Sequence, residues 1–223
     1  MWSNRFFAAG HRVMRYETAL LLLQILSSLV GCTSAQRPAT TDPIVTKPNA
    51  KVLIVYLSRT RNTEALAKLI HAEVGGTLVP LELEKPYPAD YKSTVDQVAK
   101  ENETGFLPPL KTKISGIEQY DVVFVGFPTW GMQMPPPVKS FLKRYDLKGK
   151  TVVPFNTHAG YGVGSGFQEV KQLSPGSRIL EGLSIKGGIE RDGILFVMEG
   201  EKEKQAKAEV ADWLKKIGLR SDK

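Results

Sequence analysis

Residues 58–63 read SRTRNT, where short hydrogen-bonding side chains alternate with two arginines. The run follows the apolar stretch KVLIV and precedes a segment with helical periodicity, which predicts a turn from a strand into a helix. The first turn of a helix carries free N–H groups and a partial positive charge, and both favour an anion. The turn lacks the glycine and lysine of a P-loop. It therefore predicts a site for a compact phosphate, with a plain helix cap by Thr60 or Asn62 as the alternative.

Two further loops carry residues suited to a flat ligand. The stretch GFPTWGMQMPPP (126–137) places Trp130 in a loop, where its ring could cover a planar ligand, although a tryptophan folded back over the core is the alternative. The stretch NTHAGYGVGSG (156–166) is rich in small residues, so its backbone amides could approach such a ligand closely. His158 and Tyr161 could line that site, and a purely structural role for His158 stays open. No frame of the glycine run fits a dinucleotide fingerprint.

Alternating apolar runs and helical patterns would position these loops. Strands are predicted at 52–57, 77–83, 121–127, 151–156 and 178–185, and helices around 66–74, 91–102, 138–142, 167–170 and 210–217. Pro154 is awkward for an interior strand, because it has no backbone N–H to donate. Repeated β-α units predict an α/β fold with a doubly wound parallel sheet and helices on both faces. Ligands of such sheets bind beyond the carboxyl ends of the strands, where all three loops are expected.

In combination, the three loops resemble those of the flavodoxin family, and the resemblance runs from Lys51 to the C-terminus. The family's phosphate loop, S/T-x-T-x-N/Q-T, is matched by Ser58, Thr60, Asn62 and Thr63, with an arginine in place of the usual glycine at position 61. The aromatic-glycine pair of the second loop is matched by Trp130 and Gly131. The sequence PFNT (154–157) fits a PFxT pattern common in a flavodoxin-like subgroup.

The resemblance implies a five-stranded parallel sheet in the order 2-1-3-4-5 and FMN as the cofactor. It further implies that Trp130 stacks on the isoalloxazine, that the Gly131 carbonyl meets the flavin N5–H after reduction, and that the 157–162 loop donates amides to the pyrimidine edge. The cofactor-binding residues implied in this way are Ser58, Arg59, Thr60, Arg61, Asn62, Thr63, Pro128, Thr129, Trp130, Gly131, Thr157, His158, Ala159, Gly160, Tyr161 and Gly162. No catalytic side chain is predicted, because a flavin carries the redox chemistry itself.

The function expected from the resemblance is electron transfer from FMN to a partner protein or a small acceptor. The alternative is a flavin oxidoreductase of the NAD(P)H or quinone type that acts on a small substrate. The long polar segment 84–119 could cap the flavin and build a substrate pocket, whereas a simple carrier needs only an exposed flavin edge. A third reading is a non-redox module that binds FMN poorly.

The N-terminus predicts export. Three arginines precede an apolar stretch from 19 to 30, which is too short to span a membrane comfortably, and LVGC at 29–32 resembles a bacterial lipobox. We therefore expect a signal peptide at 1–31, a lipidated Cys32 that begins a flexible tether at 32–50, and an FMN-binding domain at 51–223. The protein would lie in the bacterial cell envelope, held to the membrane only by this lipid. A cytoplasmic location is the alternative if the segment is not a functional signal.

Composition sets further limits. The 223 residues, 42% of them hydrophobic, suffice for one domain with a sizeable core. The net charge of +7 favours anionic partners, but the basic residues are spread along the chain rather than clustered with aromatics, so nucleic-acid binding is not expected. Cys32 is the single cysteine, which excludes an intrachain disulfide and a multi-cysteine metal site, and no bound metal is expected.

Overall fold

The computed structural model describes residues 50–220, so the predicted signal segment, Cys32 and nearly all of the tether lie outside the described residues. None of the helices between residues 50 and 220 is long and apolar enough to cross a membrane. The elements follow one another in the order β1 (Val52–Tyr56), α1 (Asn62–Val74), β2 (Thr77–Pro80), α2 (Tyr91–Thr104), η1 (Ile117–Gln119), β3 (Val122–Pro128), α3 (Pro136–Arg144), β4 (Thr151–His158), α4 (Gly166–Leu173), β5 (Arg178–Ile179), β6 (Leu183–Lys186), η2 (Glu190–Asp192) and α5 (Gly200–Lys216).

The strands form one parallel sheet in the order β2-β1-β3-β4-β5, with β6 also paired to β4. The predicted doubly wound sheet with strand order 2-1-3-4-5 is therefore confirmed. Strands β1 and β3 are nearly continuous apolar runs because both of their faces are covered, as is usual for parallel sheets. The edge strand β2 is shorter and only partly buried, in line with its weaker apolar pattern.

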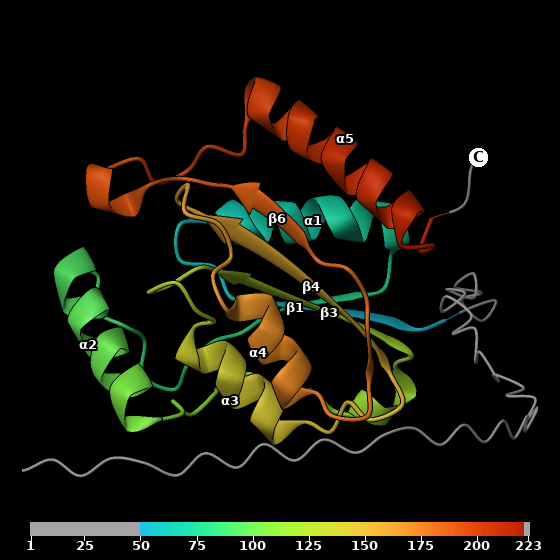
Figure 1. Ribbon diagram of the computed structural model, residues 1–223, viewed down its shortest axis with the longest axis horizontal. Helices are drawn as coiled ribbons and strands as arrows, with labels where there is room; N and C mark the ends of the chain where they lie inside the picture. The colour runs from blue at the N-terminus through green and yellow to red at the C-terminus, as the bar shows by residue number, and fades with distance from the viewer. Residues whose placement is uncertain (1–49, 221–223) are drawn as a thin grey trace, which may run out of the picture. The chain divides into compact units, whose positions relative to one another are not determined.

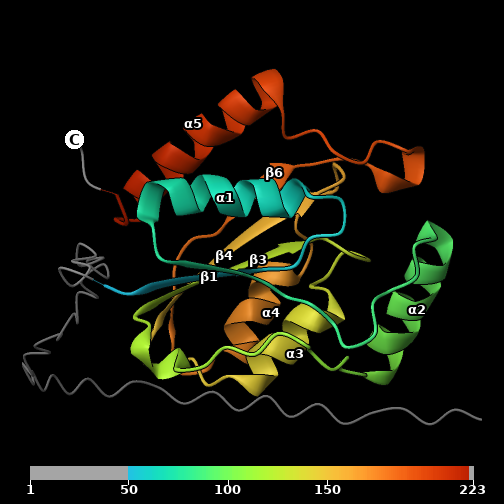
Figure 2. The same cartoon turned by 180° about the vertical axis from the view of Figure 1, so that it is seen from behind.

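Helices cover the two faces of the sheet and enclose two apolar clusters. Helices α1 and α5 lie on one face and α3 and α4 on the other (Figures 1 and 2). On the first face the ring of Phe124 meets Trp213 edge-on, with the centroids 6.0 Å apart. On the second face Phe127 meets Phe167 in the same way at 6.1 Å. The two layers fix the strand ends that carry the three loops.

The strand expected at 178–185 is two strands, and this is a correction. β5 and β6 both pair with β4 and are separated by residues 180–182. The β4 carbonyls of Val152 and His158 accept hydrogen bonds from Leu180 and Gly187, so alternate β4 residues, Pro154 among them, face β5 and β6. Pro154 has no N–H to offer there. The break in the neighbouring strand falls opposite the one residue that could not pair with it.

Helix α2 does not cover a face of the sheet. It stands beyond the carboxyl ends of the strands and packs against α3 (Figures 1 and 2). Its bounds, Tyr91–Thr104, agree with the predicted helix around 91–102. Its position brings a helix to the edge of the sheet where ligands of such folds bind.

Candidate functional site

The first loop leads from β1 into α1 through an unusual backbone conformation. Arg61 precedes the helix with a φ of 64°, in the left-handed region that glycine adopts most easily. The turn thus keeps the geometry of a glycine although an arginine stands there. The Arg61 guanidinium lies 4.9 Å from the centroid of the Phe196 ring, where a cation–π attraction offsets part of the strain.

Asn62 fixes this loop from inside. Its side chain is 3% exposed, and its amide nitrogen donates to the Thr60 hydroxyl at 2.8 Å and to the Leu195 carbonyl at 2.6 Å. Its amide oxygen accepts from the Val197 backbone N–H at 3.1 Å. The residue therefore uses both ends of its amide to join the loop to residues 195–197, a role that its place in the predicted phosphate motif did not reveal.

The N-terminus of α1 suits an anion. Arg61 precedes the helix, and its side chain does not cap it. The Ser58 hydroxyl accepts a hydrogen bond from the Glu64 N–H at 3.2 Å. Thr60 and Asn62 line the adjoining cleft. The positive end of the helix and the Thr60 hydroxyl could therefore hold a phosphate group there.

The Arg59 side chain connects three segments of the chain. Its guanidinium donates to the carbonyls of Pro88 at 2.9 Å and Ala89 at 2.8 Å, and its Nε lies 2.7 Å from a carboxylate oxygen of Glu190. The side chain is 19% exposed, so these contacts are largely shielded from solvent. The first loop is thereby joined to the segment before α2 and to η2.

The second loop holds Trp130 at the edge of the cleft. The backbone N–H and carbonyl groups of Trp130 and Gln133 bond to each other at 3.1 Å, which closes a tight turn around Gly131. The ring of Tyr87 meets the Trp130 ring nearly at a right angle, with centroids 5.4 Å apart. The Tyr87 hydroxyl donates to the Glu101 carboxylate, and burial together with this bond raises the pKa of Tyr87. Trp130 is therefore half-buried: it packs against the edge of the second apolar cluster and is contacted by Tyr87 on one side.

The third loop is organised by His158. Its Nδ1 accepts hydrogen bonds from the backbone N–H groups of Gly160 at 3.0 Å and Gly162 at 3.2 Å. An Nδ1 that accepts cannot carry a proton, so the neutral ring has its proton on Nε2. Burial lowers the pKa of His158, and the charges of Lys186 and Lys202 lower it further. Two of the amides expected to face a ligand are thus already bonded to this ring.

Short contacts join the second and third loops. The Thr129 N–H donates to the Thr157 carbonyl at 2.9 Å, and the Thr129 hydroxyl donates to the Gly162 carbonyl at 2.9 Å. Gly164 has a φ of 59°, and a Cβ there would lie 1.9 Å from the Met132 carbonyl oxygen. Only glycine fits at position 164, and its small size lets the two loops pack directly on each other.

The three loops open onto one cleft of about 740 Å³ at the carboxyl edge of the sheet, a size typical of small-molecule sites. Of the residues predicted from the sequence, its walls contain Arg59, Thr60, Asn62, Pro128, Thr129, Trp130, Gly131, Thr157, His158, Ala159, Tyr161 and Gly162. The other predicted residues do not line it: these are Ser58, Arg61, Thr63 and Gly160. Whether each residue touches a cofactor stays a prediction.

Two further segments line the cleft. Their residues were not among the predicted site residues, although segment 84–119, which contains α2, was expected to be able to cap a flavin and build a pocket. One is a face of α2, with Tyr91, Thr94, Val95, Val98, Ala99, Asn102 and Glu103, and the other is the run from Gly187 to Arg191. The apolar spacing in α2 was a visible signal, but a stripe of this kind usually marks a face that packs on the core. Met132 and Gln133 complete the lining beside Trp130.

Comparisons with known proteins identify the class. The family model for flavodoxin matches residues 51–200, and the chain therefore belongs to the flavodoxin family. A candidate flavoprotein from Bacteroides eggerthii DSM 20697 is 32% identical, with a TM-score of 0.60 over 76% of this chain and 98% of its own. The similarity to flavodoxins inferred from the three loops is thus confirmed. No curated protein matches the chain significantly.

Two other solved structures are also similar. A candidate flavoprotein from Bacteroides uniformis ATCC 8492 is 26% identical, with a TM-score of 0.61 over 75% of this chain and 99% of its own. A flavoprotein from Lactobacillus acidophilus NCFM, solved in complex with FMN, is 22% identical, with a TM-score of 0.53 over 61% of this chain and 93% of its own. At that identity the Lactobacillus protein shows the shared fold alone.

Proposed function

We propose that this protein binds FMN in the cleft and uses it to pass electrons to a partner protein or a small acceptor. The observation that carries the proposal is that the N-terminus of α1, the Trp130 loop and the 157–162 loop all open onto one cleft. Membership of the flavodoxin family supports the choice of cofactor, and so does the FMN complex of the Lactobacillus protein.

Each loop suits one part of FMN. The first turn of α1 with Thr60 would hold the phosphate, because the positive helix end attracts an anion and the Thr60 hydroxyl can donate to it. The Trp130 ring would stack on the isoalloxazine, and the remaining amides of the 157–162 loop would meet its polar edge. Bound FMN supplies one-electron and two-electron transfer, while the protein binds it, orients it and limits its contact with water.

Comparing FMN with riboflavin tests the proposal, because riboflavin lacks only the phosphate. We expect purified protein to bind FMN at least tenfold more tightly than riboflavin, as measured by quenching of flavin fluorescence. A Thr60→Ala change should weaken the binding of FMN and leave the binding of riboflavin unaffected. Equal affinity for the two flavins in the wild-type protein would refute the assignment of the phosphate to the first loop.

A second candidate function is an oxidoreductase that acts on a small substrate. The specific observation in its favour is that α2 walls the cleft, whereas a carrier needs only an exposed flavin edge. Consumption of NAD(P)H by the pure FMN-loaded protein in the presence of a quinone would favour the enzyme. A reduced protein that reacts only with other redox proteins would favour the carrier.

We also propose that the protein is anchored outside the cytoplasm by a lipid on Cys32. The support is the sequence alone, since Cys32 lies outside the described residues. A Cys32→Ser change should release the protein from bacterial membranes. Continued association of this variant with the membrane fraction would contradict the anchor.

A further inference from the structure

Helix α2 forms one wall of the cleft and is attached to the rest of the domain at both of its ends. Before its first turn, the Pro88 and Ala89 carbonyls accept from the Arg59 guanidinium, and Asp90 caps the helix by accepting from the Ser93 N–H at 2.7 Å. Near its C-terminal end, Asn102 accepts from the Lys139 ammonium of α3 at 3.1 Å. The helix is thus held in place at the carboxyl edge of the sheet without resting on its face.

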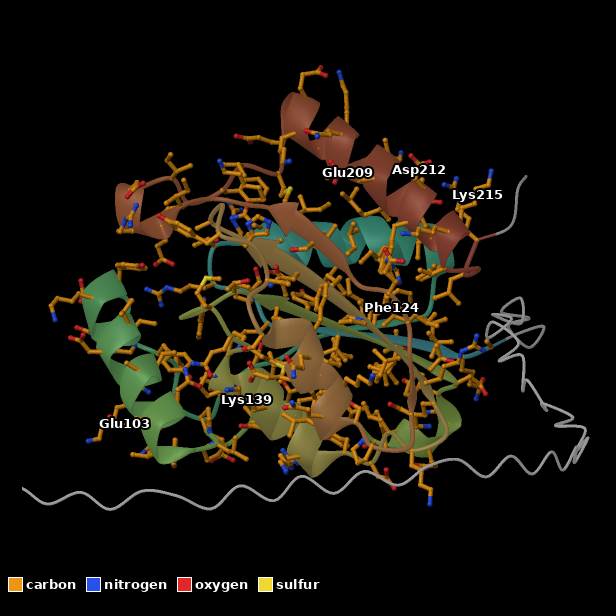
Figure 3. All side chains as sticks on the ribbon, viewed as in Figure 1. Glu103, Phe124, Lys139, Glu209, Asp212 and Lys215 are labelled. Carbon is orange, nitrogen blue, oxygen red and sulfur yellow. The ribbon has the colours of Figure 1, made fainter. Side chains whose placement is uncertain are left out.

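Lys139 strengthens the second attachment. Its ammonium lies 2.9 Å from a Glu169 carboxylate oxygen of α4 and 2.8 Å from the side-chain oxygen of Gln133 in the Trp130 loop. The side chain is 19% exposed, so the group is mostly shielded. Figure 3 shows Lys139 on α3 and Glu103 on the neighbouring end of α2. The wall and the loop that carries Trp130 therefore share one anchor.

The face of α2 toward the cleft is largely apolar. The lining contains Tyr91, Val95, Val98 and Ala99, which share one helix face. Glu103 is the one charged residue that α2 adds to this lining, whereas Lys100 does not line it. Tyr91 is 40% exposed and Val95 44%, so the wall is only partly covered by protein. An apolar helix face that lines a cleft, instead of packing on a core, indicates a place for an apolar ligand.

We propose that this wall binds a flat, uncharged aromatic electron acceptor beside the flavin, an inference that rests on the proposed function. The size of the cleft favours a small molecule, and Tyr91 offers aromatic surface for a flat ring. The arginines of the lining offer little to an anion, because Arg59 is bonded to Glu190 and Arg191 to Asp192. Val95 sits in the middle of the wall and would be a main determinant of which acceptor fits.

The electron balance of such a pair is simple for a quinone. A quinone bound there would accept two electrons and two protons supplied by reduced FMN, and its two carbonyls would become hydroxyls. The flavin would return to its oxidised form, so the atoms and electrons of this step balance. Residues of the wall hold the ring and take no part in the transfer.

The test uses 2-methyl-1,4-naphthoquinone as the probe and the full chain loaded with oxidised FMN. The two variants compared are Val95→Glu, on the cleft side of α2, and Lys100→Glu, which places the same carboxylate outside the lining. Probe binding is measured by calorimetric titration. We expect Val95→Glu to weaken the probe at least tenfold and Lys100→Glu to change its Kd less than twofold, because burying a carboxylate against an apolar ring is costly.

A third variant, Tyr91→Ala, removes aromatic surface without adding charge and should weaken binding of the probe by about threefold or more. The FMN affinity of every variant is measured first. A wild-type protein that binds FMN but not the probe would overturn this inference and leave the proposed function intact. Equal probe affinities for Val95→Glu and Lys100→Glu would also overturn it. So would a parallel loss of FMN affinity in Val95→Glu, since the wall would then cover the flavin itself.

Discussion

The hydroxyl of Thr63 in the first turn of α1 lies 2.8 Å from the hydroxyl of Thr157 near the end of β4. The two residues are 1% and 4% exposed, so water cannot replace either partner. This bond joins the helix that follows the first loop to the strand that carries the third. Both residues were predicted to touch the cofactor, but of the two Thr157 alone lines the cleft, and its bond to Thr63 holds α1 against β4.

A Thr63→Val change should destabilise the protein by about 1–3 kcal/mol, because it leaves the Thr157 hydroxyl buried without its partner. Urea unfolding measures this difference. Thr63→Ser keeps the hydroxyl and should cost about 1 kcal/mol or less, since it removes a single methyl group. A valine variant as stable as the serine variant would mean that the bond contributes nothing.

Arg59→Ala should loosen α2, whereas Arg61→Ala, its matched control in the same loop, should not. Arg59 bonds the two carbonyls before the helix, while Arg61 lies over Phe196. Without FMN, we expect amide hydrogen exchange in residues 89–100 to rise at least tenfold in the Arg59 variant. The same exchange rates in both variants would show that Arg59 does not hold the wall.

Asn62→Asp should be strongly destabilising although it is nearly isosteric. The carboxylate cannot donate to Thr60 and Leu195, and it would be buried beside the Leu195 carbonyl, so we expect a loss of about 2 kcal/mol or more in unfolding experiments. Asn102→Asp is the control, because Asn102 only accepts from the Lys139 ammonium and an aspartate can do the same. A control variant that loses as much stability as Asn62→Asp would contradict this account.

Trp130→Ala should weaken FMN binding by about tenfold and raise the two-electron reduction potential of the bound flavin. Stacking on an electron-rich ring disfavours added negative charge on the flavin, and the alanine variant removes that penalty. The Trp130→Phe variant keeps an aromatic face, so its FMN affinity and reduction potential should lie between those of the wild-type protein and of the alanine variant. Potentials from anaerobic dye titration decide the point, and an unchanged potential would place Trp130 outside the stack.

His158 should make stability depend on pH below neutrality. Its pKa is lowered in the folded protein by burial and by two lysines, so protons bind the unfolded chain better. The contribution of neutral His158 to the unfolding free energy is fully present above the unfolded pKa of about 6.5. It is lost as the pH falls from there through the folded pKa, by at most about 1.4 kcal/mol per pH unit. We expect His158→Gln to flatten the fall in unfolding free energy between pH 7 and pH 5. Nitrogen NMR at pH 7 should show the Nε2–H tautomer, and a proton on Nδ1 would contradict the two backbone bonds.

Much of the fold could be predicted from local pattern. Apolar runs such as those of β1 and β3 indicate strands covered on both faces, and glycines and prolines mark where the helices begin and end. The order of the strands came from the resemblance of the loops, not from the runs. The division of the last strand could not be predicted, because it depends on which side of β4 Pro154 faces, and that is set by pairing between distant segments.

The loops of the site could be predicted, but their side-chain roles could not. Arg59 and Arg61 look equivalent in SRTRNT, yet one clamps the segment before α2 and the other packs on an aromatic ring. Their separation depends on Pro88, Glu190 and Phe196, which lie 27 or more positions away in the chain. The α2 stripe was readable as a helix face, but only its three-dimensional position shows that it lines a cleft.

The divided strand also bears on whether the protein can pair edge to edge with a second copy of itself. A long uninterrupted outer strand offers a row of unpaired donors and acceptors on which a second chain can template itself. Here the outer border beyond β4 consists of two residues in β5 and four in β6, with a gap between them. We expect neither strand to be long enough to pair stably with a neighbouring molecule. Pro154, which interrupts pairing inside the sheet, would therefore also disfavour edge-to-edge aggregation at this border.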